Sequence, residues 1–444
     1  MMRLSNWRRN VVRRFRAWRR QSTRTENALE SFHWRALADW LRNFFFYGVL
    51  SVLVGVCVGA VTAVFGHGLL FLNEWRGEHL FWVVPFLGLA GLVIMSVNMR
   101  WGGRAQRGMG LVFDVGHGRE TSIPLRMVPM TIFSTWMTHL FGGSAGREGV
   151  AVQIGATLSM QIARIAPADL HRQIILASGM AAGFAGLFGT PIAATFFALE
   201  VLVVGSIYYE ALAPALIAAY SASFTARMLG LSAMAMPIGW VPELNSRLIG
   251  VSLLAGIVFG VVGWTFSWLL NHLRIYFAIL IDDPRLRIFI IGCLLAVVFM
   301  LAWDGRYSGL SDELFNNAFV GGDIHWYDWL LKMTLTAVTL AAGFQGGELT
   351  PLFVIGATLG SFLALMFGLP VALFAAMGSV AVFGAATKTM FAPLFIGVEV
   401  FGAQGMPYFV LVAIVAFLVS GHYGIYTKQK FLREESRMDD RLLK

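Results

Sequence analysis

A glycine-rich stretch with one acid, 142–149, carries the residues best suited to chemistry. It reads Gly-Gly-Ser-Ala-Gly-Arg-Glu-Gly and runs directly into an apolar segment. The first turn of a helix presents unpaired backbone N–H groups and the positive end of the helix dipole, and both attract anions. Glu148 would compete with an anion there until a proton neutralises it. We therefore predict that Glu148 is a gating and proton-accepting residue, the alternative being an acid that only satisfies the helix dipole. Arg147 is expected to orient the loop and to add positive potential.

A second stretch of the same design, 343–351, reads Gly-Phe-Gln-Gly-Gly-Glu-Leu-Thr-Pro. Pro351 suits the first turn of a helix, and Thr350 suits an N-cap that keeps its hydroxyl available. Glu348 is then a second acid at the same depth as the first. Two carboxylates that face one anion path repel each other, so at least one is expected to carry a proton. Glu348 is predicted to be a proton relay or an acid of the anion site.

The elements that position these loops must lie in a membrane. The 444 residues are 57% hydrophobic and 13% charged, about half the charged share of an average soluble protein. Disordered, collagen-like and disulfide-scaffold classes are excluded. The nine histidines and two cysteines show no metal-ligand spacing, and the sequence predicts neither a metal site nor a cofactor. The fold class predicted is an all-α integral membrane protein.

The charge distribution predicts the orientation. Ten arginines fall between Arg3 and Arg35, against two acids, Glu26 and Glu30, and no cleavable signal peptide follows. Such an arm could bind nucleic acid, but because it directly precedes a long apolar run, the positive-inside rule explains it more simply. We expect a multi-pass protein of the cell (inner or plasma) membrane with both termini in the cytoplasm, the lipid bilayer as its surroundings and no nucleic-acid partner.

The apolar runs differ in length. Segments 44–72 and 248–273 are long enough to cross about 30 Å of hydrocarbon. Others are too short to span alone, namely 150–163, 174–188, 352–365, 371–383 and 394–401. Broken helices at membrane depth are tolerated only where they line a cavity or are buried in protein. The pattern is typical of a transporter or channel.

The chain also repeats. The glycine loop with Glu148 is followed by Ile-Gly-Ala-Thr-Leu at 154–158, and the loop with Glu348 by the same five residues at 355–359. Glu200 and Glu399 match at nearly the same offset, and each is predicted to pair with backbone or a helix end. Two halves with matching broken helices are typical of transporters. The predicted division is a basic segment 1–43, repeats 44–232 and 245–427, and a tail 428–444.

In order along the chain, these motifs resemble those of the CLC family of anion channels and anion/proton antiporters. The family's Gly-Ser-Gly-Ile-Pro corresponds to Gly-Met-Gly-Leu-Val at 108–112, its Gly-Arg-Glu-Gly-Pro to 146–150, and its Gly-x-Phe-x-Pro to 347–351. A late tyrosine that coordinates the anion corresponds to Tyr426. The resemblance implies an inverted repeat with partly re-entrant helices and a homodimer with one pore per subunit. It assigns these residues to the anion path: Met109, Gly110, Phe113, Gly146, Arg147, Gly149, Val150, Leu349, Thr350 and Tyr426.

The departures from those motifs resemble the fluoride/proton antiporter branch. Met109 replaces a serine, and Glu348 and Thr350 occupy positions that are apolar in other members. Val201 stands where chloride-type antiporters carry an inner proton-transfer glutamate. Fluoride is a strong hydrogen-bond acceptor, so backbone N–H groups and hydroxyls suit it, and the positive ring edge of Phe113 could face it.

The function predicted is a membrane transporter, not an enzyme, that exports fluoride in exchange for protons. The nearest alternative is a chloride or nitrate/proton antiporter, or an anion channel, of the same fold. A distant alternative is an intramembrane serine hydrolase in which Ser144 is the nucleophile and His139 the base. That alternative lacks a third orienting acid and leaves the duplicated glutamate loops without a role.

Overall fold

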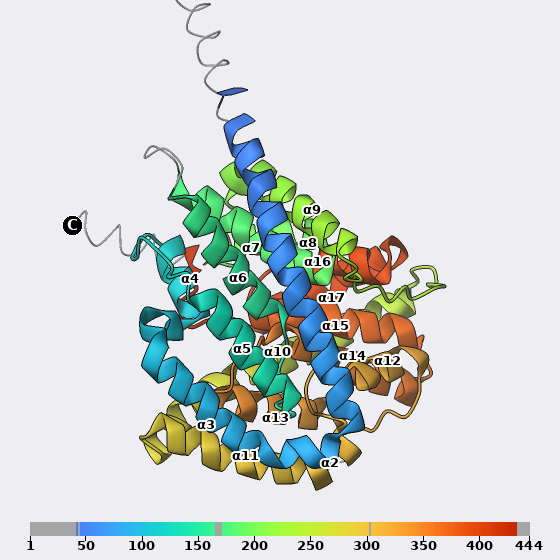
Figure 1. Ribbon diagram of the computed structural model, residues 1–444. Helices are drawn as coiled ribbons and strands as arrows, with labels where there is room; N and C mark the ends of the chain where they lie inside the picture. Colours follow the sequence, from blue (N-terminus) through green and yellow to red (C-terminus); the bar gives the residue numbers. More distant parts are fainter. Residues whose placement is uncertain (1–40, 43–44, 165–170, 302, 433–444) are drawn as a thin grey trace, which may run out of the picture. The chain divides into compact units, whose positions relative to one another are not determined.

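The computed structural model describes residues 41–42, 45–164, 171–301 and 303–432 (Figure 1). Residues 433–444 of the predicted tail 428–444 lie outside the described residues. So does nearly all of the predicted basic segment 1–43. The chain divides into two compact units, Met1–Leu50 and Ser51–Lys444. In the first unit, residues 41–42 are helical and a helix begins at Phe45. Apart from the start of the helix Phe45–Glu78, the features described below belong to the second unit.

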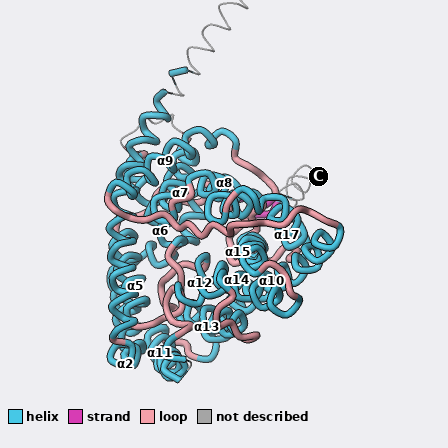
Figure 2. The backbone as a smooth tube through the Cα atoms, turned by 90° about the vertical axis from the view of Figure 1, so that its right-hand side faces the viewer, coloured by secondary structure: helices cyan, strands magenta, loops and turns pink. Residues whose placement is uncertain are grey.

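The second unit is built almost entirely of helices, and Figure 2 shows the described chain as helices joined by loops. The helix Phe45–Glu78 leads into it. The α-helices that follow are α2 (Leu80–Val83), α3 (Leu87–Val97), α4 (Met109–Gly116), α5 (Met127–Leu140), α6 (Glu148–Ile162), α7 (Arg172–Phe188), α8 (Pro191–Glu200), α9 (Leu212–Met228), α10 (Ser246–Leu280), α11 (Pro284–Leu301), α12 (Asp312–Val320), α13 (Asp328–Ala342), α14 (Leu349–Phe367), α15 (Val371–Thr387), α16 (Phe391–Ile396) and α17 (Met406–Val419). The strands β1 (Val203–Val204) and β2 (Lys430–Phe431) form a short parallel pair.

Five helices in the described chain are long and apolar enough to cross a membrane. Those at Phe45–Glu78 and Ser246–Leu280 confirm the two long segments predicted from the sequence. Two more are Pro284–Leu301 and the helical stretch Leu80–Gly116, within which α2, α3 and α4 follow one another through short helical turns. The fifth, Leu349–Phe367, corrects the prediction that segment 352–365 is too short, because this helix begins earlier and ends later than the apolar run alone indicates.

Shorter apolar helices confirm the predicted broken architecture. They are Arg172–Phe188, Pro191–Glu200, Val371–Thr387, Phe391–Phe401 and Ala403–Val419. α16 continues into a π-helical turn at Gly397–Phe401. Most residues of α7 and α15 are buried, because neighbouring helices surround both of them.

The two halves repeat the same packing. α6 packs on α7, and α14 packs on α15. In the first half, a Cβ atom built on Gly155 would meet the backbone of Gly179, and in the second half one built on Gly356 would meet the backbone of Gly378. The missing side chains therefore let the two helices of each pair approach closely.

Glu200 and Glu399 connect the halves reciprocally. Glu200, at the end of α8, accepts hydrogen bonds from the backbone N–H groups of Met390 and Ala392 at 2.8 and 2.6 Å, where α16 begins. Glu399, at the end of the second-half equivalent, accepts from Ile192 and Ala193 at 3.1 and 2.8 Å, where α8 begins. Each carboxylate satisfies free N–H groups of the opposite half. Their predicted structural role is thereby confirmed.

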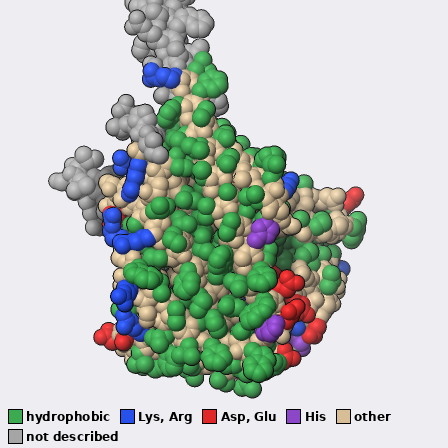
Figure 3. Space-filling view, in the orientation of Figure 1, with side chains coloured by type: hydrophobic (Ala, Val, Ile, Leu, Met, Phe, Trp, Pro, Cys, Tyr) green, Lys and Arg blue, Asp and Glu red, His purple; other side chains and the backbone are tan. Residues whose placement is uncertain are grey.

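The surface of the second unit is markedly apolar. In Figure 3, hydrophobic side chains are spread over the whole visible face, basic side chains lie mainly along its left edge and acidic ones mainly at its lower right. Trp82, Ile279 and Leu301 are 79%, 78% and 81% exposed. Large exposed apolar areas are unfavourable in water and mark a membrane or protein interface. Together with the long apolar helices, they confirm an all-α membrane protein.

Candidate functional site

The two glycine-rich loops meet in a short antiparallel bridge. The backbone N–H of Gly146 donates to the Gly347 carbonyl at 2.6 Å, and that of Gly347 donates to the Gly146 carbonyl at 2.7 Å. The bridge stands just before the first turns of α6 and α14, so it holds two helix N-termini beside each other. Two positive helix ends are thereby directed toward one region.

Three backbone amide nitrogens at the α6 terminus lie around one point beside Gly347. A methyl group built on Gly347 would lie 3.0 Å from the amide nitrogen of Gly149, 3.1 Å from that of Arg147 and 3.2 Å from that of Glu148. These distances match those of a hydrogen-bond acceptor to N–H donors. We call this group of three N–H groups the amide cluster; its geometry suits a small anion.

The Glu148 side chain lies next to the amide cluster and is fully buried. Its Oε2 atom accepts a hydrogen bond from the Thr350 hydroxyl and lies 3.3 Å from the Arg147 backbone nitrogen. Its Oε1 atom lies 3.6 Å from Arg147 Nε. The Arg147 N–H is thus shared between the Glu148 carboxylate and the Thr350 hydroxyl oxygen, which also lies 3.3 Å away.

Glu348 occupies the N-cap position of α14 and joins the site to a cavity. This corrects the expected helix start, because Thr350 lies inside the first turn and its hydroxyl binds Glu148 instead of capping the helix. A Cβ atom built on Gly149 would lie 3.4 Å from Glu348 Oε2. The other oxygen, Oε1, lies 3.2 Å from Arg274 Nη2.

A cavity of about 410 Å³ opens beside Glu348. Of the residues predicted for the anion path, Met109, Gly110, Phe113, Glu348 and Tyr426 line it. The Tyr426 hydroxyl is buried and has no hydrogen-bond partner, and the ring of Phe113 lies 5.2 Å from that of Tyr426. A buried hydroxyl without a partner is costly unless a ligand completes it. The cavity wall therefore offers a free donor.

The remaining predicted residues lie outside the cavity wall, at or behind the bridge. Gly146 belongs to the bridge, Arg147 and Gly149 belong to the amide cluster, and Thr350 contacts Glu148. Leu349 and Val150 are buried in apolar packing. The predicted residues thus form two adjacent groups, one around the amide cluster and one around the cavity.

Sequence reasoning missed several cavity residues, among them Gln153, Arg274, Arg107 and Lys428. Gln153 lies on α6 shortly after Glu148, and its Oε1 atom is buried without a partner. A glutamine in an apolar helix close to the gating acid is a signal that could have identified it. Arg274 follows a long apolar segment of α10, where positive charge is also expected merely from the membrane interface.

Charged residues cluster where α4 meets the segment that carries Lys428. The buried carboxylate of Asp114 pairs with both Arg107 and Lys428. Arg107 also lies 2.9 Å from Glu120, and this hydrogen bond lowers the pKa of the Glu120 carboxyl. Burial lowers the pKa of Lys428, and the like charge of Arg107 adds to that effect. Asp114 therefore neutralises part of the positive charge at the cavity rim.

Ser144 and His139 do not form the pair that a serine hydrolase requires. The Ser144 hydroxyl binds Lys332 Nζ at 3.0 Å and Thr336 Oγ1 at 2.9 Å. The His139 ring nitrogens face the backbone carbonyls of Thr135 and Ala145 at 2.8 and 3.0 Å. The serine hydroxyl is committed to a buried network, which removes the geometric basis for that alternative.

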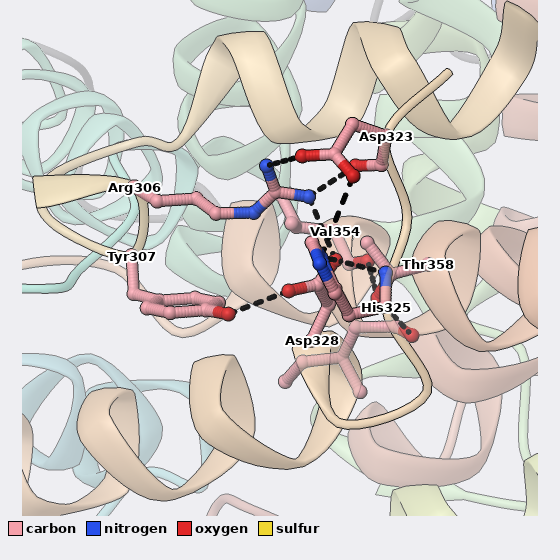
Figure 4. Close-up of polar contacts among 8 residues, drawn as sticks. Arg306, Tyr307, Asp323, His325, Asp328, Val354 and Thr358 are labelled. Atoms are coloured by element: carbon pink, nitrogen blue, oxygen red, sulfur yellow. Dashed lines mark hydrogen bonds and ion pairs between the residues drawn. The ribbon is translucent and has the colours of Figure 1, made fainter. Parts of the chain in front are cut away.

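A separate polar cluster orders the loops between α11 and α13 (Figure 4). The fully buried Asp328 carboxylate accepts from Arg306 at 2.8 Å, from the Tyr307 hydroxyl at 2.5 Å and from the His325 backbone N–H at 2.8 Å. Burial and the bond to Asp328 raise the pKa of Tyr307 well above its ordinary value. None of these residues lines the cavity beside Glu348, which favours a structural role for the cluster. The described residues also contain no group of three or more His, Cys, Asp or Glu that could hold a metal ion.

The fold and the site agree with comparisons to known proteins. The family model described as voltage gated chloride channel matches residues 87–421. A chloride/fluoride channel protein of Pseudomonas syringae pv. tomato is 37% identical over 419 residues, covering 91% of each chain. The H(+)/Cl(-) exchange transporter ClcA of Vibrio cholerae is 26% identical over 70% of this chain and 71% of its own.

Solved structures extend the comparison. The crystal structure of a CLC-type fluoride/proton antiporter is 46% identical, with a TM-score of 0.86, over 87% of this chain and 98% of its own. A slow cyanobacterial Cl⁻/H⁺ antiporter, 21% identical with a TM-score of 0.73, shares the fold. The architecture and the site therefore define a membrane anion transporter or channel. The chain belongs to the voltage gated chloride channel family, the CLC family.

Proposed function

We propose that this protein is a fluoride/proton antiporter that exports fluoride while protons move inward. The observation that carries the proposal is the buried Glu148 carboxylate beside three backbone amide nitrogens grouped around one point. Protonation of Glu148 frees the Arg147 N–H for an anion, and departure of the anion lets the carboxylate return. Proton uptake and anion binding are thereby linked at one place. The similarity to a CLC-type fluoride/proton antiporter supports the same function.

The donors around this place favour fluoride over larger halides. Backbone N–H groups, the Thr350 hydroxyl and the unpartnered Tyr426 hydroxyl are all hydrogen-bond donors. Fluoride is compact and accepts hydrogen bonds strongly, so it gains most from several short contacts. Because Met109 has no hydroxyl, it cannot donate a hydrogen bond to an ion in the cavity. The donors named above must therefore hold the ion.

Glu348 is proposed to relay the proton between Glu148 and the inner side. Its carboxylate lines the cavity, and its Oε2 atom faces Gly149, the residue next to Glu148. Val201, which replaces the acid of the usual inner route, cannot carry a proton. Glu348, an acid between Glu148 and the cavity, can carry the proton instead.

The assembly and orientation are part of the same proposal. We propose a homodimer in the plasma membrane with one pore in each subunit and both termini in the cytoplasm. The arginine-rich segment ahead of the first long apolar helix supports this orientation. The repeats 44–232 and 245–427 are the proposed transport halves, flanked by the segments 1–43 and 428–444.

Reconstituted vesicles test the function directly. Vesicles loaded with fluoride or chloride are monitored with ion electrodes and a pH probe. We expect fluoride efflux with stoichiometric proton uptake and much slower chloride efflux. Glu148→Gln mimics the protonated gate and should abolish proton uptake, and Glu348→Gln should strongly reduce it. Chloride efflux as fast as fluoride efflux contradicts the selectivity, and full proton pumping by Glu348→Gln contradicts the relay.

A further inference from the structure

Arg274 is a cationic side chain in direct contact with the proposed proton relay. It lies on α10 and lines the cavity, and its Nη2 atom is 3.2 Å from Glu348 Oε1. The Arg274 side chain is 38% exposed, whereas that of Glu348 is 14% exposed. The guanidinium is therefore the more exposed partner of this ion pair.

The other cations near this position have different partners. Arg107 and Lys428, which also line the cavity, both pair with Asp114. Arg147 lies beside Glu148, with Nε 3.6 Å from Oε1. In the described chain, Arg274 forms its ion pair with Glu348. Its positive charge becomes available to another anion whenever Glu348 loses its own charge.

Glu348 connects this arginine to the gate. One carboxylate oxygen faces Arg274, and the other lies close to the Gly149 backbone at the amide cluster. A proton that arrives at Glu348 removes the negative charge that holds the guanidinium. A guanidinium beside a neutral acid no longer has the Coulomb attraction of an ion pair. It then favours any free anion in the same cavity.

We propose that Arg274 alternates between two anionic partners, the Glu348 carboxylate and a fluoride ion that enters the cavity. This inference rests on the proposed function. When Glu348 holds a proton, Arg274 recruits fluoride from the inner solution. When fluoride moves on toward the amide cluster, Arg274 returns to Glu348 and favours release of the proton from that carboxyl to the inner solution. The exchange links fluoride loading to proton delivery.

The proposal predicts a specific pH dependence of fluoride binding from the inner side. Lower pH favours neutral Glu348 and should strengthen binding at Arg274. Other groups facing the same region are the Tyr426 hydroxyl, the Glu148–Arg147 pair and the Asp114 cluster with Arg107 and Lys428. The Arg274 variant retains all of these groups, including Glu148, so a decrease in the pH dependence relative to wild type is attributable to Arg274 and its partner.

The experiment compares Arg274→Gln with Arg247→Gln, an exposed arginine on the same helix and outside the cavity wall. Purified full-length proteins are titrated with sodium fluoride by calorimetry at acidic and neutral pH. We expect wild type and Arg247→Gln to bind fluoride more tightly at acidic pH. Arg274→Gln should bind about tenfold more weakly at acidic pH, the loss of one charge-assisted contact, and its pH dependence should shrink to the part that protonation of Glu148 supplies. Arg274→Lys keeps the positive charge but lacks the planar guanidinium, so its fluoride affinity should lie between those of wild type and Arg274→Gln.

Vesicle transport supplies the second readout. Arg274→Gln should still move fluoride down its gradient while transporting fewer protons per fluoride. In the double variant it should not lower the proton-to-fluoride ratio below that of Glu348→Gln, because both changes act on one pair. A wild-type proton-to-fluoride ratio in Arg274→Gln overturns the inference, as does an additive double variant. If wild-type vesicles exchange no protons, the proposed function fails, and the binding titration still decides whether Arg274 takes fluoride.

Discussion

Gly347→Ala is the most direct test of the amide cluster as a fluoride site. The added methyl group would lie 3.0–3.2 Å from three backbone nitrogens, at the point where an anion would accept their hydrogen bonds. Gly347 is not among the residues with a positive φ angle, so alanine is compatible with its backbone. The neighbouring residues must shift by only tenths of an ångström, and we expect the protein to fold.

The size of the effect follows from the contacts that the methyl group removes. A hydrogen bond to a charged acceptor contributes about 1.5–3 kcal/mol. Loss of a single one weakens fluoride binding by about 10- to 150-fold, and loss of all three weakens it more. We therefore expect at least a tenfold fall in fluoride affinity and a corresponding fall in transport at limiting fluoride.

The assay is fluoride efflux from vesicles, supported by calorimetric titration of the purified protein. Gly250→Ala is the matched control, because a Cβ atom at this α10 position has no neighbour within 4 Å. It should transport as wild type does. A Gly347→Ala protein with wild-type melting temperature and fluoride affinity would refute the assignment of the amide cluster to fluoride.

Two further predictions concern stability. Gly356→Ala should lower the melting temperature in detergent, because its Cβ atom would meet the Gly378 backbone and overpacking costs about 1–3 kcal/mol. The control Gly250→Ala should leave the melting temperature unchanged. Equal melting temperatures for the two variants would contradict the close approach of α14 and α15. Asp328→Asn should cost about 3 kcal/mol, because it leaves the Arg306 charge without its buried partner. The Asp323 side chain pairs with the same arginine but is 71% exposed, so Asp323→Asn should lower the free energy of unfolding by less than about 1 kcal/mol. Thermal unfolding of both variants distinguishes the buried pair from the exposed one.

The sequence by itself determined the class of protein and the segments that carry the chemistry. Composition and the length of apolar runs are properties of local sequence, and they indicate membrane helices without knowledge of their neighbours. The glycine loops with Glu148 and Glu348 were recognisable because helix starts that bind anions need glycine and free N–H groups within a few residues. The matching positions of Glu200 and Glu399 likewise revealed the repeat.

The tertiary structure alone decided which groups meet. Convergence of the amide cluster beside Gly347 depends on a bridge between loops about 200 residues apart, and no local pattern encodes that distance. Thr350 looked like an N-cap, yet the position of Glu148 across the bridge gave its hydroxyl another partner. Arg274 meets Glu348 because α10 places the two side chains together, although 74 residues separate them in the sequence. Helix packing sets these pairs, and packing depends on side chains from every segment together, whereas helix propensity and charge are read one segment at a time.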